Sequence, residues 1–134
     1  MTHMFDTSAL LCLYFQEPGS ETLAELFADP ANETGISALS IMEFWAVLKR
    51  RGHEERLEQD WLSLRPIFSE IVPATESIVL NAVALRRAAS DRLPSMDAII
   101  AATAQAHGAT LVHCDAHFAA IPAEQLVQLV LPTK

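Results

Sequence analysis

The sequence predicts an α/β protein in which helices flank a mostly parallel sheet. Short apolar segments alternate with amphipathic ones along the chain, which is the pattern of α/β layering. The length of 134 residues fits one domain, 1–134, with a proper hydrophobic core. A hydrophobic fraction of 51% with 19% charged residues is typical of a folded protein.

Two strands and four helices are expected in the first half of the chain. The segments "HMF" at 3–5 and "ETGIS" at 33–37 are short, and each precedes a helical pattern, which favours strands. Pro30 closes the second helical pattern and Gly52 ends the third. The expected helices span 7–15, 20–30, 38–52 and 54–68.

Three strands and two helices are expected in the second half. Apolar residues recur at helical spacing over 76–92, and a second helix, "LPSMDAIIAATAQAHG" at 93–108, is entered through Pro94 and Ser95 and ended by Gly108. The expected strands span 70–73, 109–114 and 125–132, of which "ATLVHC" is β-branched and resembles a buried strand.

The chain is acidic, with nine basic residues against seventeen acidic ones and a net charge of −8. Proteins that clamp nucleic acids tightly usually present a basic surface, so this balance argues against that class. It is compatible with a site where metal ions supply positive charge, and with a basic protein partner. The bases occur in small groups that either contact phosphates or are solvated: Lys49, Arg50 and Arg51; Arg86 and Arg87; and Arg92.

No apolar run approaches the roughly 20 residues of a membrane-spanning helix, and the N-terminus lacks a signal-peptide pattern. We therefore expect a cytoplasmic protein with no membrane partner. Cys12 and Cys114 lie far apart in apolar segments, without zinc-ligand spacing, and are expected to be buried free thiols.

Asp97 is the only formally charged residue between Leu93 and Cys114. An acid in the first helical turn gains about 0.3 to 1 kcal/mol from the helix dipole, which is one explanation. However, the helix is apolar nearly all round, and burying an unpaired carboxylate costs several kcal/mol. A cation is therefore needed, and no Lys or Arg follows nearby.

Three more acids lie in apolar surroundings, and each has a structural alternative. Asp6 ends the first strand and could cap the following helix, and Asp115 ends a later strand and could serve a turn or cap. Glu43 completes a capping box with Ser40 if the helix starts there, but lies in the second turn if it starts at Ser37. The remaining acids in polar segments are expected to be solvated: Asp29, Glu54, Glu55, Glu58, Asp60 and Glu70.

Four carboxylates converging on one place would repel each other and raise their pKa values unless a divalent cation lay among them. A site with only oxygen ligands favours Mg²⁺ or Mn²⁺ over zinc.

The segments "FDTSALL", "SALSIMEF", "MDAIIAATAQAHGATLV" and "CDAHF" resemble the PIN-domain ribonucleases, and among them the VapC-type toxins of bacterial toxin–antitoxin pairs. The resemblance extends from about Met4 to Phe118. It implies a three-layer α/β/α domain whose acidic pocket binds Mg²⁺ or Mn²⁺ and cleaves RNA by attack of a metal-activated water on a phosphodiester. It also implies a homodimer and an antitoxin whose tail, expected to be basic, enters the pocket.

The resemblance implies that the metal-binding and catalytic acids are Asp6, Glu43, Asp97 and Asp115, with Asp6 and Asp97 as direct ligands. A hydroxyl of Thr7 or Ser8 is expected to orient metal or water. A non-catalytic PIN-like module that binds RNA or protein is the alternative. A receiver-like phosphoacceptor is disfavoured, because such domains have paired acids after the first strand and a Lys after a late one.

The segment "HCDAHF" departs from the family, which commonly reads Thr-Arg-Asp-x-Asp-Phe at this place. Cys114 replaces the usual arginine, and His117 replaces the second acid. His117 is therefore a substitute ligand, a proton carrier or a surface histidine.

Overall fold

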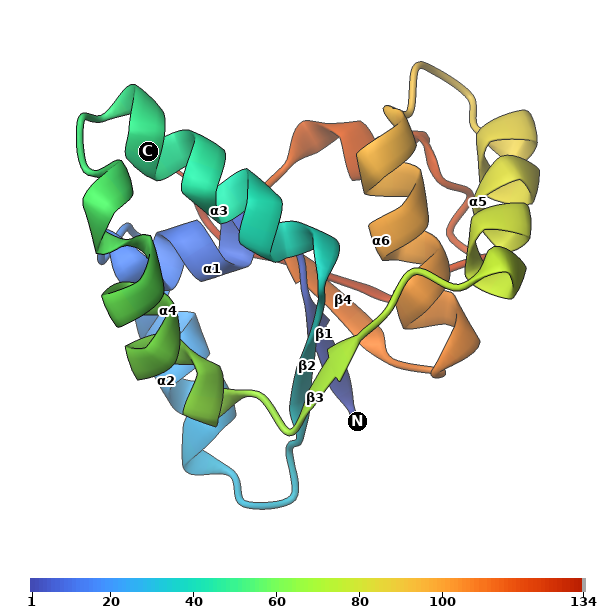
Figure 1. The fold of residues 1–134 in the computed structure, drawn as a ribbon. Helices are drawn as coiled ribbons and strands as arrows, with labels where there is room; N and C mark the ends of the chain where they lie inside the picture. The colour runs from blue at the N-terminus through green and yellow to red at the C-terminus, as the bar shows by residue number, and fades with distance from the viewer. Residues whose placement is uncertain (134) are drawn as a thin grey trace.

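Five parallel strands form the centre of the computed structural model, which describes residues 1–133 (Figure 1). The strands are β1 (His3–Phe5), β2 (Thr34–Ser37), β3 (Glu70–Val72), β4 (Thr110–His113) and β5 (Gln128–Val130). Their order across the sheet is β3-β2-β1-β4-β5, so the chain runs outward from β1 in one direction and then in the other.

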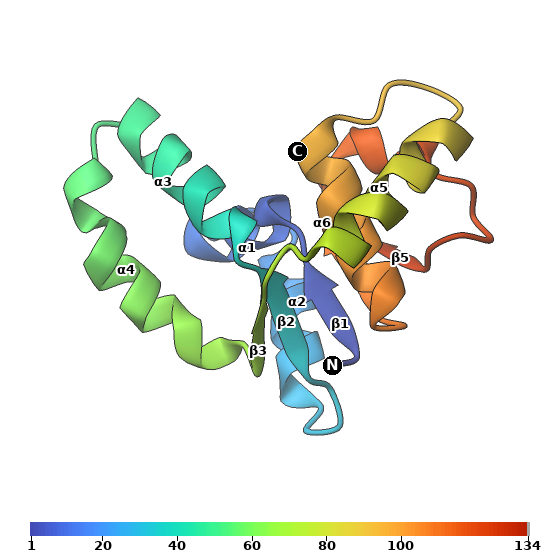
Figure 2. The same ribbon diagram turned by 45° about the vertical axis from the view of Figure 1, so that its right-hand side comes forward.

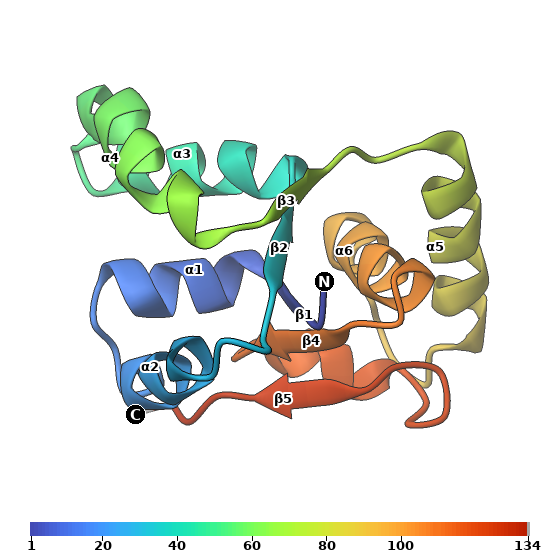
Figure 3. The ribbon, with the colours of Figure 1, turned by 90° about the horizontal axis from the view of Figure 1, so that it is seen from below.

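Helices cover both faces of the sheet, and the resulting three layers confirm the expected fold (Figure 3). One face packs against α5 (Glu76–Ala88) and α6 (Ser95–Ala106), and receives Met4 and Leu111. The other receives Phe5, Ile36 and Val112, which pack against the remaining helices. These helices are α1 (Thr7–Tyr14), α2 (Ser20–Ala28), α3 (Leu39–Arg50) and α4 (Leu57–Leu64).

The alternation of buried side chains along the strands explains this layering. Met4 pairs with Leu111 and Phe5 with Val112 in the parallel ladder between β1 and β4, and successive side chains point to opposite faces. Because both faces are covered, β1, β2 and β4 are buried along nearly their whole length, as the apolar sequence of β4 indicated.

Two glycines end helices where the sequence predicts it. Gly52 follows α3 and Gly108 follows α6, with φ of +78° and +60°. A residue with a Cβ is strained in this left-handed region, so glycine is the natural residue there.

The expected helix over 54–68 is wrong in its ends. The α-helical part is α4 alone, preceded by a 3₁₀ turn, η1 (Glu54–Arg56), and followed by another, η2 (Arg65–Ile67). Pro66 lies in η2 and cannot donate a backbone hydrogen bond, which ends the regular helix.

The helix expected over 76–92 ends at Ala88, because the next residues are bound elsewhere. The backbone N–H of Ser90 donates to the carbonyl of Ala120 (2.9 Å), and the Arg86 guanidinium donates to the carbonyl of Leu93 (2.9 Å). Figure 2 shows the connection that leads from α5 to α6.

Asp60 was expected to be solvated, and this expectation is wrong. Its carboxylate is buried, accepts a hydrogen bond from the Tyr14 hydroxyl and lies 3.0 Å from Nε of Arg56. These two donors hold the pKa of Asp60 below its usual value. The three side chains link α1 to α4.

The two cysteines are free thiols as expected, but only Cys12 is fully buried. Among the described residues, the longest helix is α5 with 13 residues, and none is long and apolar enough to cross a membrane.

Candidate active site

The carboxyl ends of the parallel strands meet at one edge of the sheet, and the candidate residues gather there. Asp6 directly follows β1, and Asp115 lies two residues after β4. Because β1 and β4 are neighbours at the point where the strand order reverses, their ends border the crevice in which open α/β sheets bind ligands.

Asp6 is buried and caps the N-terminus of α1, as one of its two explanations predicted, and it also lies at the crevice. Its Oδ2 accepts hydrogen bonds from the backbone N–H and the hydroxyl of Ser8, at 3.0 and 2.5 Å. The Ser8 hydroxyl in turn accepts from the backbone N–H of Cys114 (3.1 Å). The end of β1 is thereby connected to the end of β4.

Glu43 lies in the second turn of α3, and the capping box with Ser40 does not form. The helix begins at Leu39, and its first orphan N–H donates to the hydroxyl of Ser37 (3.1 Å). The Thr7 hydroxyl donates to Glu43 Oε1 (2.5 Å) and also lies 2.9 Å from the hydroxyl of Ser40. The Thr7 and Ser8 hydroxyls therefore orient carboxylates.

Asp97 and Asp115 complete the group from the other side of the crevice. Asp97 is the third residue of α6 and is buried. Asp115 caps a short 3₁₀ helix, η3 (Ala116–Ala120), that the sequence did not predict, by accepting the N–H of His117 (2.9 Å).

One cavity of 240 Å³ is lined by all four of the predicted acids. Thr7, Ser8, Leu11, Ala46, Val47 and Arg50 complete its wall. Of the three consecutive bases at the end of α3, Arg50 is the one in this wall. Lys49 lies over the ring of Trp45 (5.1 Å), and Arg51 over the ring of Phe15 (4.0 Å).

Burial in the shared cavity raises the pKa values of Asp6, Glu43 and Asp97 above their usual range. Burial, and then repulsion by the other three carboxylates, raises the pKa of Asp97 from 3.8 to about 6. The ionised pocket is therefore electrostatically costly without a cation.

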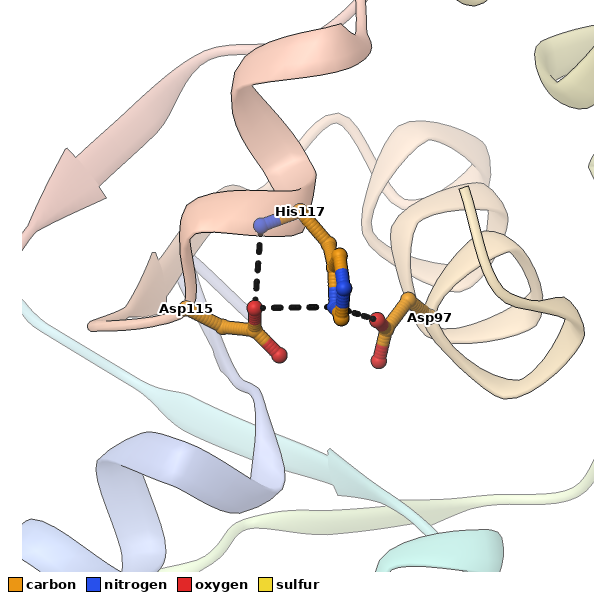
Figure 4. Close-up of side chains that lie close together, drawn as sticks. All are labelled: Asp97, Asp115 and His117. Atoms are coloured by element: carbon orange, nitrogen blue, oxygen red, sulfur yellow. Dashed lines mark hydrogen bonds and ion pairs between the residues drawn. The ribbon is translucent and has the colours of Figure 1, made fainter. Parts of the chain in front are cut away.

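His117 contacts two of the acids, which a histidine free on the surface would not do (Figure 4). Its Nδ1 lies 3.1 Å from Oδ2 of Asp97 and 3.2 Å from Oδ1 of Asp115. The sequence left its role open, and only its place two residues after Asp115 pointed to it.

His113, at the end of β4, holds the backbone of Asp115 in place. It is buried, and its Nδ1 accepts the backbone N–H of Asp115 (3.1 Å). Its proton is therefore on Nε2, which donates to Oε1 of Gln128 (2.7 Å). Gln128 also donates to the carbonyl of Phe118 (3.1 Å), so side chains connect β4, β5 and η3.

The PIN domain family model matches residues 4–124. The chain belongs to the PIN domain family. The resemblance inferred from the four sequence segments is thereby confirmed. A comparison with curated proteins found no match.

Solved structures of toxin–antitoxin systems share the fold of this PIN domain. A toxin–antitoxin complex from Klebsiella pneumoniae is 28% identical, with a TM-score of 0.73 over 99% of this chain and 100% of that chain. VapBC2 from Rickettsia felis, bound to a promoter DNA fragment, is 19% identical, with a TM-score of 0.78 over 98% and 100%. VapC20 from Mycobacterium tuberculosis, described as a toxin that cleaves the sarcin–ricin loop, is 20% identical, with a TM-score of 0.72 over 98% and 100%. The last two identities are low and show the fold alone.

The donors of this PIN domain fit a divalent cation. Carboxylate oxygens are preferred ligands of Mg²⁺ and Mn²⁺, and four of them share one cavity. Burial first, and then repulsion by the neighbouring carboxylates, raises the pKa values of Asp6, Glu43 and Asp97, and a divalent cation would offset the cost of ionising them. Asp97, Asp115 and His117 also bring one ligand atom each to within 4.8 Å of one another.

Proposed function

We propose that this PIN domain is a Mg²⁺- or Mn²⁺-dependent endoribonuclease and the toxin of a toxin–antitoxin pair. The observation that carries the proposal is the cavity at the carboxyl edge of β1 and β4, where acids from four separate segments gather. The family match and the toxin structures of the same fold support it.

Asp6, Glu43, Asp97 and Asp115 would hold the ion. When bound, Mg²⁺ or Mn²⁺ lowers the pKa of a water and offsets charge that develops on phosphoryl oxygens. The acids are ligands in this proposal and not nucleophiles. The Ser8 and Thr7 hydroxyls keep Asp6 and Glu43 in their orientations, so little reorganisation is needed.

Replacement of Asp97 by Asn should lower the rate of RNA cleavage at least about a hundredfold and leave the fold intact. The side chain keeps its shape but loses the negative charge that would bind the metal ion. Cleavage of a defined RNA panel with Mn²⁺, with and without EDTA, measures this. Glu58→Gln is the matched control, because it removes the same negative charge at an exposed position on α4. Undiminished metal-dependent cleavage by Asp97→Asn would exclude the role. RNA binding without EDTA-sensitive cleavage by the unaltered protein would instead indicate a non-catalytic module.

We also propose that the cognate antitoxin inserts a basic tail into the acidic cavity. The net charge of −8 and the four carboxylates of the cavity support such a tail. A cytoplasmic location belongs to the same proposal, because the RNA and the antitoxin would both be met there.

A homodimer is the third part of the proposal, and the apolar surface of α5 supports it. Val79, Leu80 and Val83 lie on one face of α5 and are 39%, 62% and 40% exposed. We expect the protein to sediment as a dimer and Leu80→Glu to shift it toward the monomer by tenfold or more in dissociation constant, since the charge would lose its water at the interface. Leu62→Glu on α4 is the control for the loss of an exposed leucine. A monomer at high micromolar concentration would contradict this part.

A further inference from the structure

His117 offers a nitrogen donor at a site whose other donors are carboxylate oxygens. Its imidazole comes from the first turn of η3, between Asp115 on its own segment and Asp97 at the start of α6 (Figure 4). The ring is half exposed, so it does not fill the hydrophobic core, and it contacts two of the acids that line the cavity, Asp97 and Asp115.

The imidazole nitrogen lies at the spacing of a neighbouring ligand from each of two carboxylates, and all three donor atoms are within 4.8 Å of one another. Nδ1 of His117 lies 3.1 Å from Oδ2 of Asp97 and 3.2 Å from Oδ1 of Asp115. Adjacent ligands of an octahedral ion at 2.0 to 2.1 Å are separated by about 3.0 Å. A single proton on Nδ1 can make only one strong, well-aligned hydrogen bond at a time, whereas one ion can take all three atoms.

Backbone hydrogen bonds position the segment that carries His117 and orient the Asp115 carboxylate beside it. The N–H of His117 donates to the same Oδ1 of Asp115 (2.9 Å), and the N–H of Asp115 donates to Nδ1 of His113 (3.1 Å). Both ring nitrogens of His113 are thus engaged, by Asp115 and by Gln128. His117, and not His113, has the nitrogen that faces the carboxylates.

We propose that Nδ1 of His117 is a direct ligand of the bound metal ion, which gives the site a mixed nitrogen and oxygen donor set. This inference rests on the metal site of the proposed function. Imidazole binds first-row transition ions better than it binds Mg²⁺, which prefers oxygen ligands. A nitrogen ligand in an otherwise all-oxygen site therefore shifts its preference from Mg²⁺ toward first-row transition ions, and Mn²⁺ is the probe because it is paramagnetic and also accepts the oxygen ligands.

The rival role for His117 is that of an internal cation, paired with Asp97 and Asp115 and competing with metal. The two roles predict opposite effects when the side chain is removed. Loss of a ligand weakens Mn²⁺ binding, whereas loss of a competing positive charge strengthens it.

The experiment measures Mn²⁺ binding to the full chain by electron paramagnetic resonance, with pulsed detection of directly bound ¹⁴N. The unaltered protein should show imidazole nitrogen coupling that is absent in His117→Ala and His117→Asp. His117→Ala should bind Mn²⁺ roughly ten- to hundredfold more weakly, the range seen even for the loss of outer-shell partners. His117→Asp, which restores an all-oxygen donor set, should regain most of the affinity and show a lower preference for Mn²⁺ over Mg²⁺. His53→Ala, at an exposed histidine after α3, should behave as the unaltered protein.

The outcomes separate this inference from the proposed function. Mn²⁺ binding that is lost in Asp97→Asn but shows no nitrogen coupling would overturn the role of His117 and leave the function standing. Tighter binding by His117→Ala would overturn it in favour of the competing cation. No Mn²⁺ binding by the unaltered protein would overturn both. Because His117→Asp tests selectivity in a protein that still binds metal, a folding defect in His117→Ala does not obscure the answer.

Discussion

At the scale of the residue, the stabilisation of Asp97 by the helix dipole is smaller than the cost of ionising its buried carboxylate. Its place in the first turn of α6 is favourable by at most about 1 kcal/mol. Its pKa of about 6, against 3.8 ordinarily, corresponds to a cost on the order of 2 to 3 kcal/mol for the ionised form. The helix dipole alone therefore does not explain this carboxylate.

The raised pKa of Asp97 makes stability depend on pH in a definite direction. Between pH 3.8 and about 6 the folded state holds a proton that the unfolded state has released, so stability falls as pH rises through this window. Asp6 and Glu43 shift in the same direction. In EDTA, we expect the melting temperature to be higher at pH 5.5 than at pH 7.5 by several degrees, with a smaller difference in Asp97→Asn. Calorimetry at both pH values checks this, and an equal difference in the two proteins would be inconsistent with the assignment.

The gathering of Asp6, Glu43, Asp97 and Asp115 in one cavity could be predicted, because each lies in an apolar segment where an unpaired charge is costly. The contacts of His117 could not be predicted, because they depend on η3, a 3₁₀ helix of five residues without a hydrophobic period. The contact of His113 with Gln128 could not be predicted either, because it depends on how β5 aligns with β4. The burial of Asp60 could not be predicted either, because its partner Tyr14 is 46 residues away in the sequence.

At the scale of the element, α3 presents the cavity with both an acid and a base. Glu43 and Arg50 are seven residues apart, close to two helical turns, and both line the cavity. The two neighbouring bases lie over aromatic rings, so in the proposed function Arg50 would be the base of this group available to contact an RNA phosphate.

We expect Arg50→Ala to raise KM for RNA about five- to tenfold with a smaller effect on kcat, because a phosphate contact contributes to binding. The slope of log KM against log salt should decrease by about one. Arg51→Ala is the matched control, since Arg51 packs on Phe15. Equal effects of the two changes would show that only overall charge matters.

The strands and most helices were predictable from their hydrophobic patterns, and the glycines and prolines located several ends. Helix ends that depend on tertiary hydrogen bonds were not predictable from the sequence. The early end of α5 is an example, because the backbone N–H of Ser90 donates to the carbonyl of Ala120. Of the two alternatives that the sequence left open for Glu43, the capping box with Ser40 does not form, since the Ser40 hydroxyl faces Thr7 of another helix.

At the scale of the whole molecule, the negative charge and the acidic cavity would favour binding of the proposed basic tail over binding of the proposed RNA substrate. Free RNA must approach a protein of net charge −8, whereas a basic tail is attracted to it.

An arginine-rich peptide of about ten residues should therefore inhibit RNA cleavage. Its inhibition constant should rise at least tenfold between 50 and 300 mM salt, because the attraction is screened. Competition kinetics in the presence of Mn²⁺ measure this, with a peptide of the same length rich in glutamine as the control. Inhibition that does not change with salt would argue against an electrostatic tail.

The side-chain connection from His113 to Gln128 also constrains how this protein can vary. In a strand, a shift of one residue turns every side chain to the opposite face. An insertion or deletion before β5 that moved its register against β4 would take Gln128 away from both His113 and the carbonyl of Phe118. The turn that carries Asp115 and His117 would then lose its support. The hydrogen bonds of Gln128 thus fix the alignment of the edge strand β5 against β4. Changes in the length of the loop before β5 should therefore be tolerated less well than changes in the exposed turn between α3 and α4.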